Sequence, residues 1–134
     1  MKNNWKSKNR HKYLLQYHLI FVCKYTKKLF TKEISDDVKQ LSYEICQKHN
    51  VTIHEMETDK DHIHHMIETE PTISMSDLVR TMKSYITYHI WDSHKKYLSK
   101  HFGKENTFFT DGYFVCSVGN VSEKQLRKHI ESQG

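Results

Sequence analysis

The sequence predicts an α+β protein with a ferredoxin-like (RRM-like) sandwich: a four-stranded antiparallel sheet, helices on one face and a C-terminal helix. Runs of strand and helix character follow one another as strand, helix, strand, strand, helix, strand, helix. The 134 residues fit one domain, and four glycines with a single proline argue against long linkers. We therefore expect one domain over residues 1–134, with a basic, flexible arm at 1–12.

The predicted arm stands out by its charge. No acidic residue precedes Glu33, whereas the first twelve residues include five cations: Lys2, Lys6, Lys8, Arg10 and Lys12. The whole chain has a net charge of +5 and a pI of about 9.0, which favours a polyanionic partner. The arm is interpreted either as a solvated tail or as a segment that contacts nucleic acid.

The first strand and first helix are predicted by composition and spacing. Residues 17–25, YHLIFVCKY, are rich in β-branched and aromatic side chains and too short for a buried helix. Apolar residues on both faces fit an edge strand that a partner covers. The helix that follows is predicted by apolar residues at helical spacing: Ile34, Val38, Leu41 and Ile45. Asn50 suits its C-terminal cap.

The middle of the sequence predicts a β-hairpin. Residues 51–58 alternate between two faces, the polar DKD of residues 59–61 makes a tight turn, and residues 62–68 form the next strand. Because only a tight turn separates these two strands, we expect them to pair in the sheet.

The last third contains a long helix, a short strand and a final helix. Ser74 or Ser76 can cap the long helix, whose apolar stripe repeats every four residues and which ends near Gly103. Residues 113–118 form the fourth strand after an Asp-Gly turn. Ser122 and Gln125 have capping-box spacing, so residues from Glu123 onward are predicted to be helical.

Histidines concentrate on the third predicted strand. Because side chains alternate along a strand, His62 and His64 point to one face while Ile63 and His65 point to the other. Two imidazoles on one face can bind a divalent cation, and Asp61 can orient one of the rings. The spacing alone also fits ordinary polar residues on a wet face. His54 and His65 are interpreted as wet-face or rim residues without a role.

The three cysteines and the hydrophobic pattern bear on the compartment. Cys23, Cys46 and Cys116 are scattered and odd in number, which argues against a disulfide framework or a zinc knuckle. No apolar run reaches the length of a membrane span or resembles a signal peptide. We expect a protein of the reducing cytoplasm, without a membrane partner.

Four stretches together resemble one protein family. They are YHLIFVCKY at the first strand, TDKDHIH at the histidine strand, GYFVCSVGNVSE before the last helix and HIESQ within it. The sequence resembles the TnpA-type HUH transposases, small tyrosine transposases of insertion sequences that move as single-stranded DNA. The resemblance runs from about Tyr13 to Gln133.

The resemblance implies a metal site and a substrate. His62 and His64 would hold Mg²⁺ or Mn²⁺, and Gln133 on the last helix would complete the protein ligands. The substrate would be single-stranded DNA with hairpins at the ends of the element, cut and rejoined by transesterification through a covalent link between protein and DNA. The family also implies a homodimer with composite active sites, in which the histidines and the last helix come from different subunits.

The sequence departs from the family at the nucleophile. The family's tyrosine precedes the glutamine by four residues, and this chain has His129 at that position. Three interpretations of His129 stay open. In the first, His129 is a substitution in an inactive, repurposed or altered copy. In the second, it is an unusual nucleophile or general base, and in the third it adds a third imidazole to the metal.

Five cations are candidate DNA contacts: Arg10, Lys12, Lys28, Arg80 and Lys83. Arg80 and Lys83 resemble family positions that line the DNA surface, although ordinary solvated charge on the long helix is an equally good interpretation. Two rival functions remain: a DNA-binding protein of the same fold without catalysis, and an RNA-binding ferredoxin-like module. The second lacks the usual aromatic pair, because the third strand has histidines there.

Overall fold

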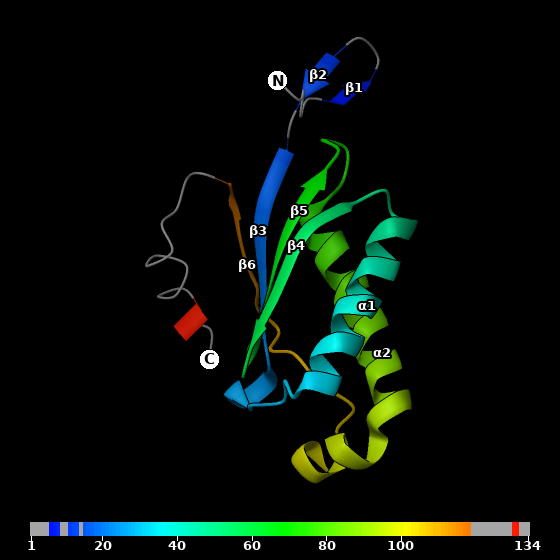
Figure 1. The fold of residues 1–134 in the computed structure, drawn as a ribbon, viewed down its shortest axis with the longest axis vertical. Helices are drawn as coiled ribbons and strands as arrows, with labels where there is room; N and C mark the ends of the chain where they lie inside the picture. Colours follow the sequence, from blue (N-terminus) through cyan, green and yellow to red (C-terminus); the bar gives the residue numbers. More distant parts are fainter. Residues whose placement is uncertain (1–5, 9–10, 14, 119–129, 132–134) are drawn as a thin grey trace.

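The described part of the chain is a four-stranded antiparallel sheet with two long helices. The computed structural model describes residues 6–8, 11–13, 15–118 and 130–131. The sheet consists of β3 (Leu15–Val22), β4 (Thr52–Asp59), β5 (His62–Thr69) and β6 (Phe114–Ser117), in the order β4-β5-β3-β6 (Figure 1). Helix α1 (Lys32–Lys48) connects β3 to β4, and α2 (Met75–Phe102) connects β5 to β6. This connectivity confirms the predicted ferredoxin-like class.

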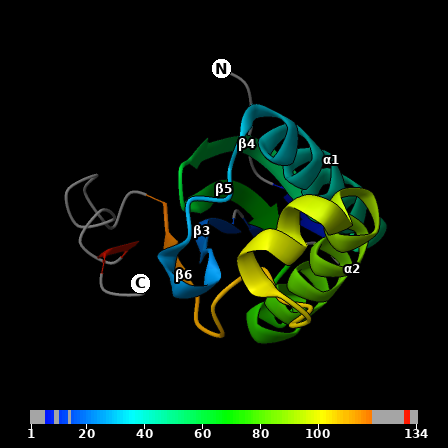
Figure 2. The same ribbon diagram turned by 90° about the horizontal axis from the view of Figure 1, so that it is seen from below.

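Both helices pack against the same face of the sheet (Figure 2). Leu19 and Phe21 of β3 and Ile63 and Ile67 of β5 are fully buried in the core beneath them. The helices contribute their apolar stripes to this core: Ile34, Val38, Ile45 and Cys46 from α1, and Leu78, Val79, Met82, Ile86, Ile90, Trp91, Leu98 and Phe102 from α2. The predicted apolar residues of α1 are buried except Leu41, which is partly buried against the core, and the apolar stripe of α2 is buried as its spacing predicts.

Strand β3 is central, so the prediction that it is an edge strand is wrong. It pairs along its length with β5 on one side and with β6 on the other. Ile20 and Val22 are buried as well as Leu19 and Phe21. The apolar residues on both faces of β3 match this burial, because Leu19 and Phe21 are buried beneath the helices and Ile20 and Val22 are buried on the opposite face.

Strand β3 also ends earlier than predicted. It stops at Val22, and a 3₁₀ turn, η1 (Lys24–Thr26), follows. Tyr25 and Thr26 adopt left-handed conformations there, with φ of 60° and 50°. Such backbone is uncommon for residues other than glycine, and the local composition, which favours a strand, does not reveal it.

Side-chain caps begin both long helices, and the predicted residues Asn50 and Gly103 follow their ends. Thr31 caps α1 by accepting a hydrogen bond from the backbone N–H of Ile34, and Asn50 follows the helix with a left-handed φ of 58°. Of the two serines proposed for α2, Ser74 is the cap, because its side chain accepts from the N–H of Asp77. Gly103 ends α2 with a φ of 61°.

The two ends of the chain are described only in part. In the basic arm, β1 (Lys6–Lys8) and β2 (His11–Tyr13) pair as a short antiparallel hairpin beyond the start of β3 (Figure 1). Of the predicted last helix, Ile130 and Glu131 are described and are helical. Within the described ranges, no helix is both long enough and apolar enough to cross a membrane.

Candidate metal and nucleic-acid site

The predicted metal histidines lie on the face of the sheet opposite the two helices. Directly paired residues of neighbouring strands share a face, and His62 pairs with Val22 while His64 pairs with Ile20. None of these four belongs to the core beneath the helices. We call this the histidine face and define it by His18, His62 and His64. The predicted alternation along β5 is thereby confirmed.

His62 is held by its neighbour Asp61. The Nδ1 atom of His62 lies 3.0 Å from the carboxylate Oδ1 of Asp61. A carboxylate only accepts hydrogen bonds, so Nδ1 carries the hydrogen, and the lone pair of the neutral ring lies on Nε2. A carboxylate that orients a histidine in this way is the usual second partner of a metal-binding imidazole.

His64 is held by a histidine that the sequence did not single out. Its Nε2 atom lies 2.8 Å from Nδ1 of His18 on β3. Burial lowers the pKa of His64, and the proximity of His18 lowers it further, while Glu57 and Glu55 on β4 act in the opposite direction. The neutral ring that metal binding requires is therefore favoured at neutral pH.

The turn after β3 fixes the position of Asp61. The backbone N–H of Cys23 donates to the carbonyl of Asp61 over 2.8 Å, and that of Phe30 donates to Lys60 over 3.1 Å. Both contacts hold the β4–β5 turn against residues 23–30. The residue that orients His62 is therefore held by its backbone as well as by its place in the hairpin.

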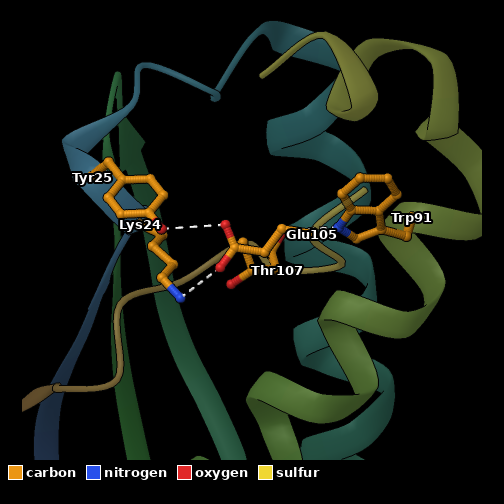
Figure 3. Close-up of polar contacts among 5 residues, drawn as sticks. All are labelled: Lys24, Tyr25, Trp91, Glu105 and Thr107. Atoms are coloured by element: carbon orange, nitrogen blue, oxygen red, sulfur yellow. Dashed lines mark hydrogen bonds and ion pairs between the residues drawn. The ribbon is translucent and has the colours of Figure 1, made fainter. Parts of the chain in front are cut away.

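The same turn is attached to the segment between α2 and β6. Glu105 accepts hydrogen bonds from Lys24 Nζ at 3.1 Å and from the Tyr25 hydroxyl at 3.2 Å (Figure 3). Two residues later the carbonyl of Thr107 accepts from the indole N–H of Trp91 on α2 at 2.7 Å. Glu105 and Thr107 thus connect the left-handed turn at Tyr25 to the helix layer.

The interpretation of His65 as a wet-face or rim residue is wrong. The side chain is fully buried on the helix side of the sheet. Its Nδ1–H donates to the carbonyl of Leu19 at 3.1 Å, and Nε2 accepts from the hydroxyl of Ser42 at 3.2 Å. Burial lowers the pKa of His65 to about 4. His54, by contrast, is exposed and lies 3.3 Å from Glu68.

The candidate DNA contacts have different surroundings. Lys28 is exposed, and Arg80 is exposed and paired with Asp77 at 3.1 Å. Lys83 is half-buried, and its ammonium donates to the carbonyls of Thr110 and Gly112, each at 2.7 Å. Burial lowers the pKa of Lys83 to about 8. Because its ammonium donates to these two carbonyls, Lys83 holds the loop before β6 in place.

Arg80 and Lys83 also line a groove. It lies between α2 and residues 106–113, has a volume of about 820 Å³, and includes Lys95 and the exposed Tyr88 in its wall. Exposed aromatic rings beside cations are a common surface for single-stranded nucleic acid. Among the other candidates, Arg10 lies outside the described residues, and Lys12 belongs to β2.

His129 and Gln133, the predicted nucleophile position and third ligand, also lie outside the described residues. Within the part of the chain that is described, no three His, Cys, Asp or Glu side chains are grouped closely enough to hold a metal ion. The donor types still fit a divalent ion: two imidazoles share a face, one oriented by a carboxylate, and the other favoured in its neutral form. An ion held by His62 and His64 would need a further ligand from outside the histidine face.

His18 belongs to the histidine face but is not among the residues predicted from the sequence. Alternation along β3 places it on the same face as Ile20 and Val22, so its orientation was available from the sequence. Its contact with His64 was not, because that contact depends on which strands pair and in which register. Residues 18 and 64 are 46 positions apart and meet only in the folded sheet.

Comparison with known proteins identifies the family. Residues 11–133 match the model of the IS200-like transposases. The chain is 26% identical over 121 residues to the ISDra2 transposase TnpA of Deinococcus radiodurans, covering 90% of this chain and 85% of that protein. It is 29% identical over 118 residues to the transposase of insertion sequence IS200 of Salmonella typhimurium, covering 88% and 76%.

Two solved structures share the fold. A candidate transposase from Deinococcus radiodurans R1 superposes with a TM-score of 0.87 at 23% identity, covering 96% of this chain and 97% of that one. A REP-associated tyrosine transposase bound to a REP hairpin gives a TM-score of 0.54 at 14% identity, covering 96% and 70%. The match to the family model spans nearly the whole sheet-and-helix domain and both histidine-bearing motifs, so the chain belongs to the IS200-like transposase family.

Proposed function

We propose that the protein binds single-stranded DNA that folds into hairpins and holds a divalent ion, Mg²⁺ or Mn²⁺, at His62, His64 and Gln133. The observation that carries the proposal is the histidine face, where two imidazoles of one strand are each held at one ring nitrogen. The hairpin-bound relative and the net charge of +5 support DNA as the partner.

The family reaction joins the protein to DNA. A tyrosine oxygen forms a bond to phosphorus while a bond between phosphorus and a sugar oxygen breaks, and the reverse transfer rejoins strands. A bound divalent ion supplies Lewis-acid chemistry, polarising the scissile phosphate. His62 and His64 leave positions open for phosphate and water, because two imidazoles are a small part of the ligand set of a hard cation.

His129 stands where the tyrosine would act. An imidazole attached to phosphorus forms a phosphoramidate, which is more labile than a phosphotyrosyl ester. We infer that the protein binds hairpin DNA and the ion but forms no stable covalent adduct through this helix.

The test is restoration of the nucleophile. Labelled single-stranded hairpin DNA is incubated with Mn²⁺ and the natural chain, His129→Tyr or His129→Phe, with an unstructured strand of equal composition as the DNA control. We expect all three proteins to bind the hairpin and only His129→Tyr to yield a denaturant-resistant adduct. His129→Phe is the matched control because it lacks only the hydroxyl of tyrosine.

Other results decide between the interpretations of His129. Cleavage by the natural chain that disappears in His129→Ala would show that the imidazole is the nucleophile or base. Loss of Mn²⁺ binding in His129→Ala would show that the imidazole of His129 is a metal ligand. Equal affinity for hairpin and unstructured strands would contradict hairpin recognition, and no affinity for either would remove DNA as the partner.

A further inference from the structure

The contact between His18 and His64 has a consequence for how a metal ion would bind. The two rings come from adjacent strands, with their centroids 5.0 Å apart and their planes inclined by 32°. Nδ1 of His18 and Nε2 of His64 are 2.8 Å apart, which is hydrogen-bonding distance. One of these two nitrogens must therefore carry the hydrogen, and the other must present a lone pair.

Only one arrangement of this hydrogen leaves His64 able to bind an ion. A neutral imidazole has one N–H and one lone-pair nitrogen. If His18 donated, the lone pair on Nε2 of His64 would be occupied and its Nδ1 would carry hydrogen, so neither nitrogen could bind metal. If His64 donates from Nε2, its lone pair lies on Nδ1 and is free.

We propose that His18 is a positioning residue for the metal site: it accepts the Nε2–H of His64 and so directs Nδ1 of His64 to the ion. This inference rests on the proposed metal site. His62 is held in the complementary way, since Asp61 accepts its Nδ1–H and leaves Nε2 for the ion. Each ligand is thus fixed by one partner at one nitrogen, the arrangement that sets ring orientation and tautomer at metal sites.

The alternative role for His18 is that of a ligand. Within the described residues, no group of three metal-binding side chains is close enough to hold an ion, so His18, His62 and His64 do not form such a group. His18 contacts His64 directly, so its role is to orient the ring of His64 and not to bind the ion itself.

The first test is metal affinity, measured by the loss of the free Mn²⁺ paramagnetic resonance signal. Removing an outer partner of a metal ligand typically weakens binding by about 10- to 100-fold, and we expect this range for His18→Ala. His18→Gln, whose amide oxygen can accept from Nε2 of His64, should recover most of the affinity. His54→Ala is the matched control, because His54 contacts Glu68 and none of the three residues His18, His62 and His64.

The second test locates the ligating nitrogens in the unchanged chain, and decides the matter even where a His18 variant fails to fold. With ¹⁵N-labelled histidine and ¹¹³Cd²⁺, metal coupling should appear at Nδ1 of His64 and Nε2 of His62. Coupling at Nε2 of His64, or at any nitrogen of His18, would overturn the proposal. So would unchanged Mn²⁺ affinity in a folded His18→Ala.

Failure of the two proposals can be told apart. If the natural chain binds neither Mn²⁺ nor ¹¹³Cd²⁺, the metal part of the proposed function falls and the role of His18 falls with it. If the natural chain binds the ion and His18→Ala binds it equally well, only the role of His18 is lost. Hairpin binding is measured separately and depends on neither result.

Discussion

At the scale of single residues, neighbouring histidines of β5 have opposite surroundings. His64 lies on the histidine face within reach of two carboxylates, whereas His65 is fully buried between Leu19 and Ser42. Both ring nitrogens of neutral His65 are hydrogen-bonded inside the core. Protonation would place a charge in the core without water, and Nε2 could no longer accept from Ser42. One position along a strand is enough to separate a candidate ligand from a core residue.

The burial of His65 predicts that stability falls in mild acid. Its pKa is about 4 in the fold, against 6.5 for the free side chain. As pH falls below 6.5 the unfolded chain takes up a proton that the folded chain does not, so the stability due to the neutral ring is full above that pH and is lost towards pH 4. Between pH 7 and pH 5 this loss should be about 2 kcal/mol.

Urea unfolding at the two pH values measures this loss. His65→Gln should be less stable than the natural chain at pH 7 and should show a pH dependence smaller by the stated amount. His49→Gln is the control, since His49 is exposed at the end of α1. An unaltered dependence in His65→Gln would show that other groups cause it.

At the scale of elements, the long helices begin at residues whose side chains replace missing backbone partners. Thr31 and Ser74 each accept a hydrogen bond from the N–H three residues later. Ser76 is in the first turn of α2 and contacts the hydroxyl of Ser74 at 3.2 Å, without capping a backbone N–H. The two serines therefore differ in role although both fit the same sequence signal.

This difference predicts unequal effects of two identical substitutions. Ser74→Ala removes the cap of α2 and should lower the free energy of unfolding by about 1 kcal/mol. Ser76→Ala should change it by less than about 0.5 kcal/mol, because alanine is favoured inside a helix. Chemical denaturation of the two variants in parallel measures both values, and equal losses would contradict the assignment of the cap.

At the scale of the whole molecule, the sheet order brings the described residues of the proposed metal site together on one face. His18 comes from β3, His62 and His64 from β5, and the anchoring of Asp61 from the turn after β3. The family resemblance predicts that Gln133 and His129 lie on a last helix, against the histidines of a second subunit. The proposed homodimer would make each site from two chains.

A mixing experiment tests the composite site. His64→Ala combined with His129→Tyr has the nucleophile without the metal ligand, whereas the natural chain has the ligand without the nucleophile. We expect neither protein alone to form an adduct with hairpin DNA in Mn²⁺, and co-expressed mixed dimers to form it.

The matched control is the His129→Tyr protein, whose dimers should form the adduct without mixing. Light scattering establishes whether dimers are present. If mixed dimers form and give no adduct while this control does, the histidines and the last helix of one site belong to the same chain.

Local patterns in the sequence predict the order of the strands and long helices, the face of β5 that carries His62 and His64, and the helix ends at Asn50 and Gly103. These follow from local rules: side-chain period, capping chemistry and backbone preference act over a few residues. The family was also readable from short motifs. The residues at the ends of the chain, His129 and Gln133 among them, remain predictions from that resemblance.

Tertiary structure alone decided the position of β3 in the sheet, the burial of His65, the use of Lys83 to hold the loop before β6, and the contact of His18 with His64. Each depends on the pairing of segments far apart in the sequence. The local sequence of an apolar strand is the same at the edge or the centre of a sheet, and a histidine has no neighbouring pattern that distinguishes a solvent-exposed from a buried position. Only strand order and packing distinguish them, because burial and hydrogen-bond partners are properties of the assembled sheet.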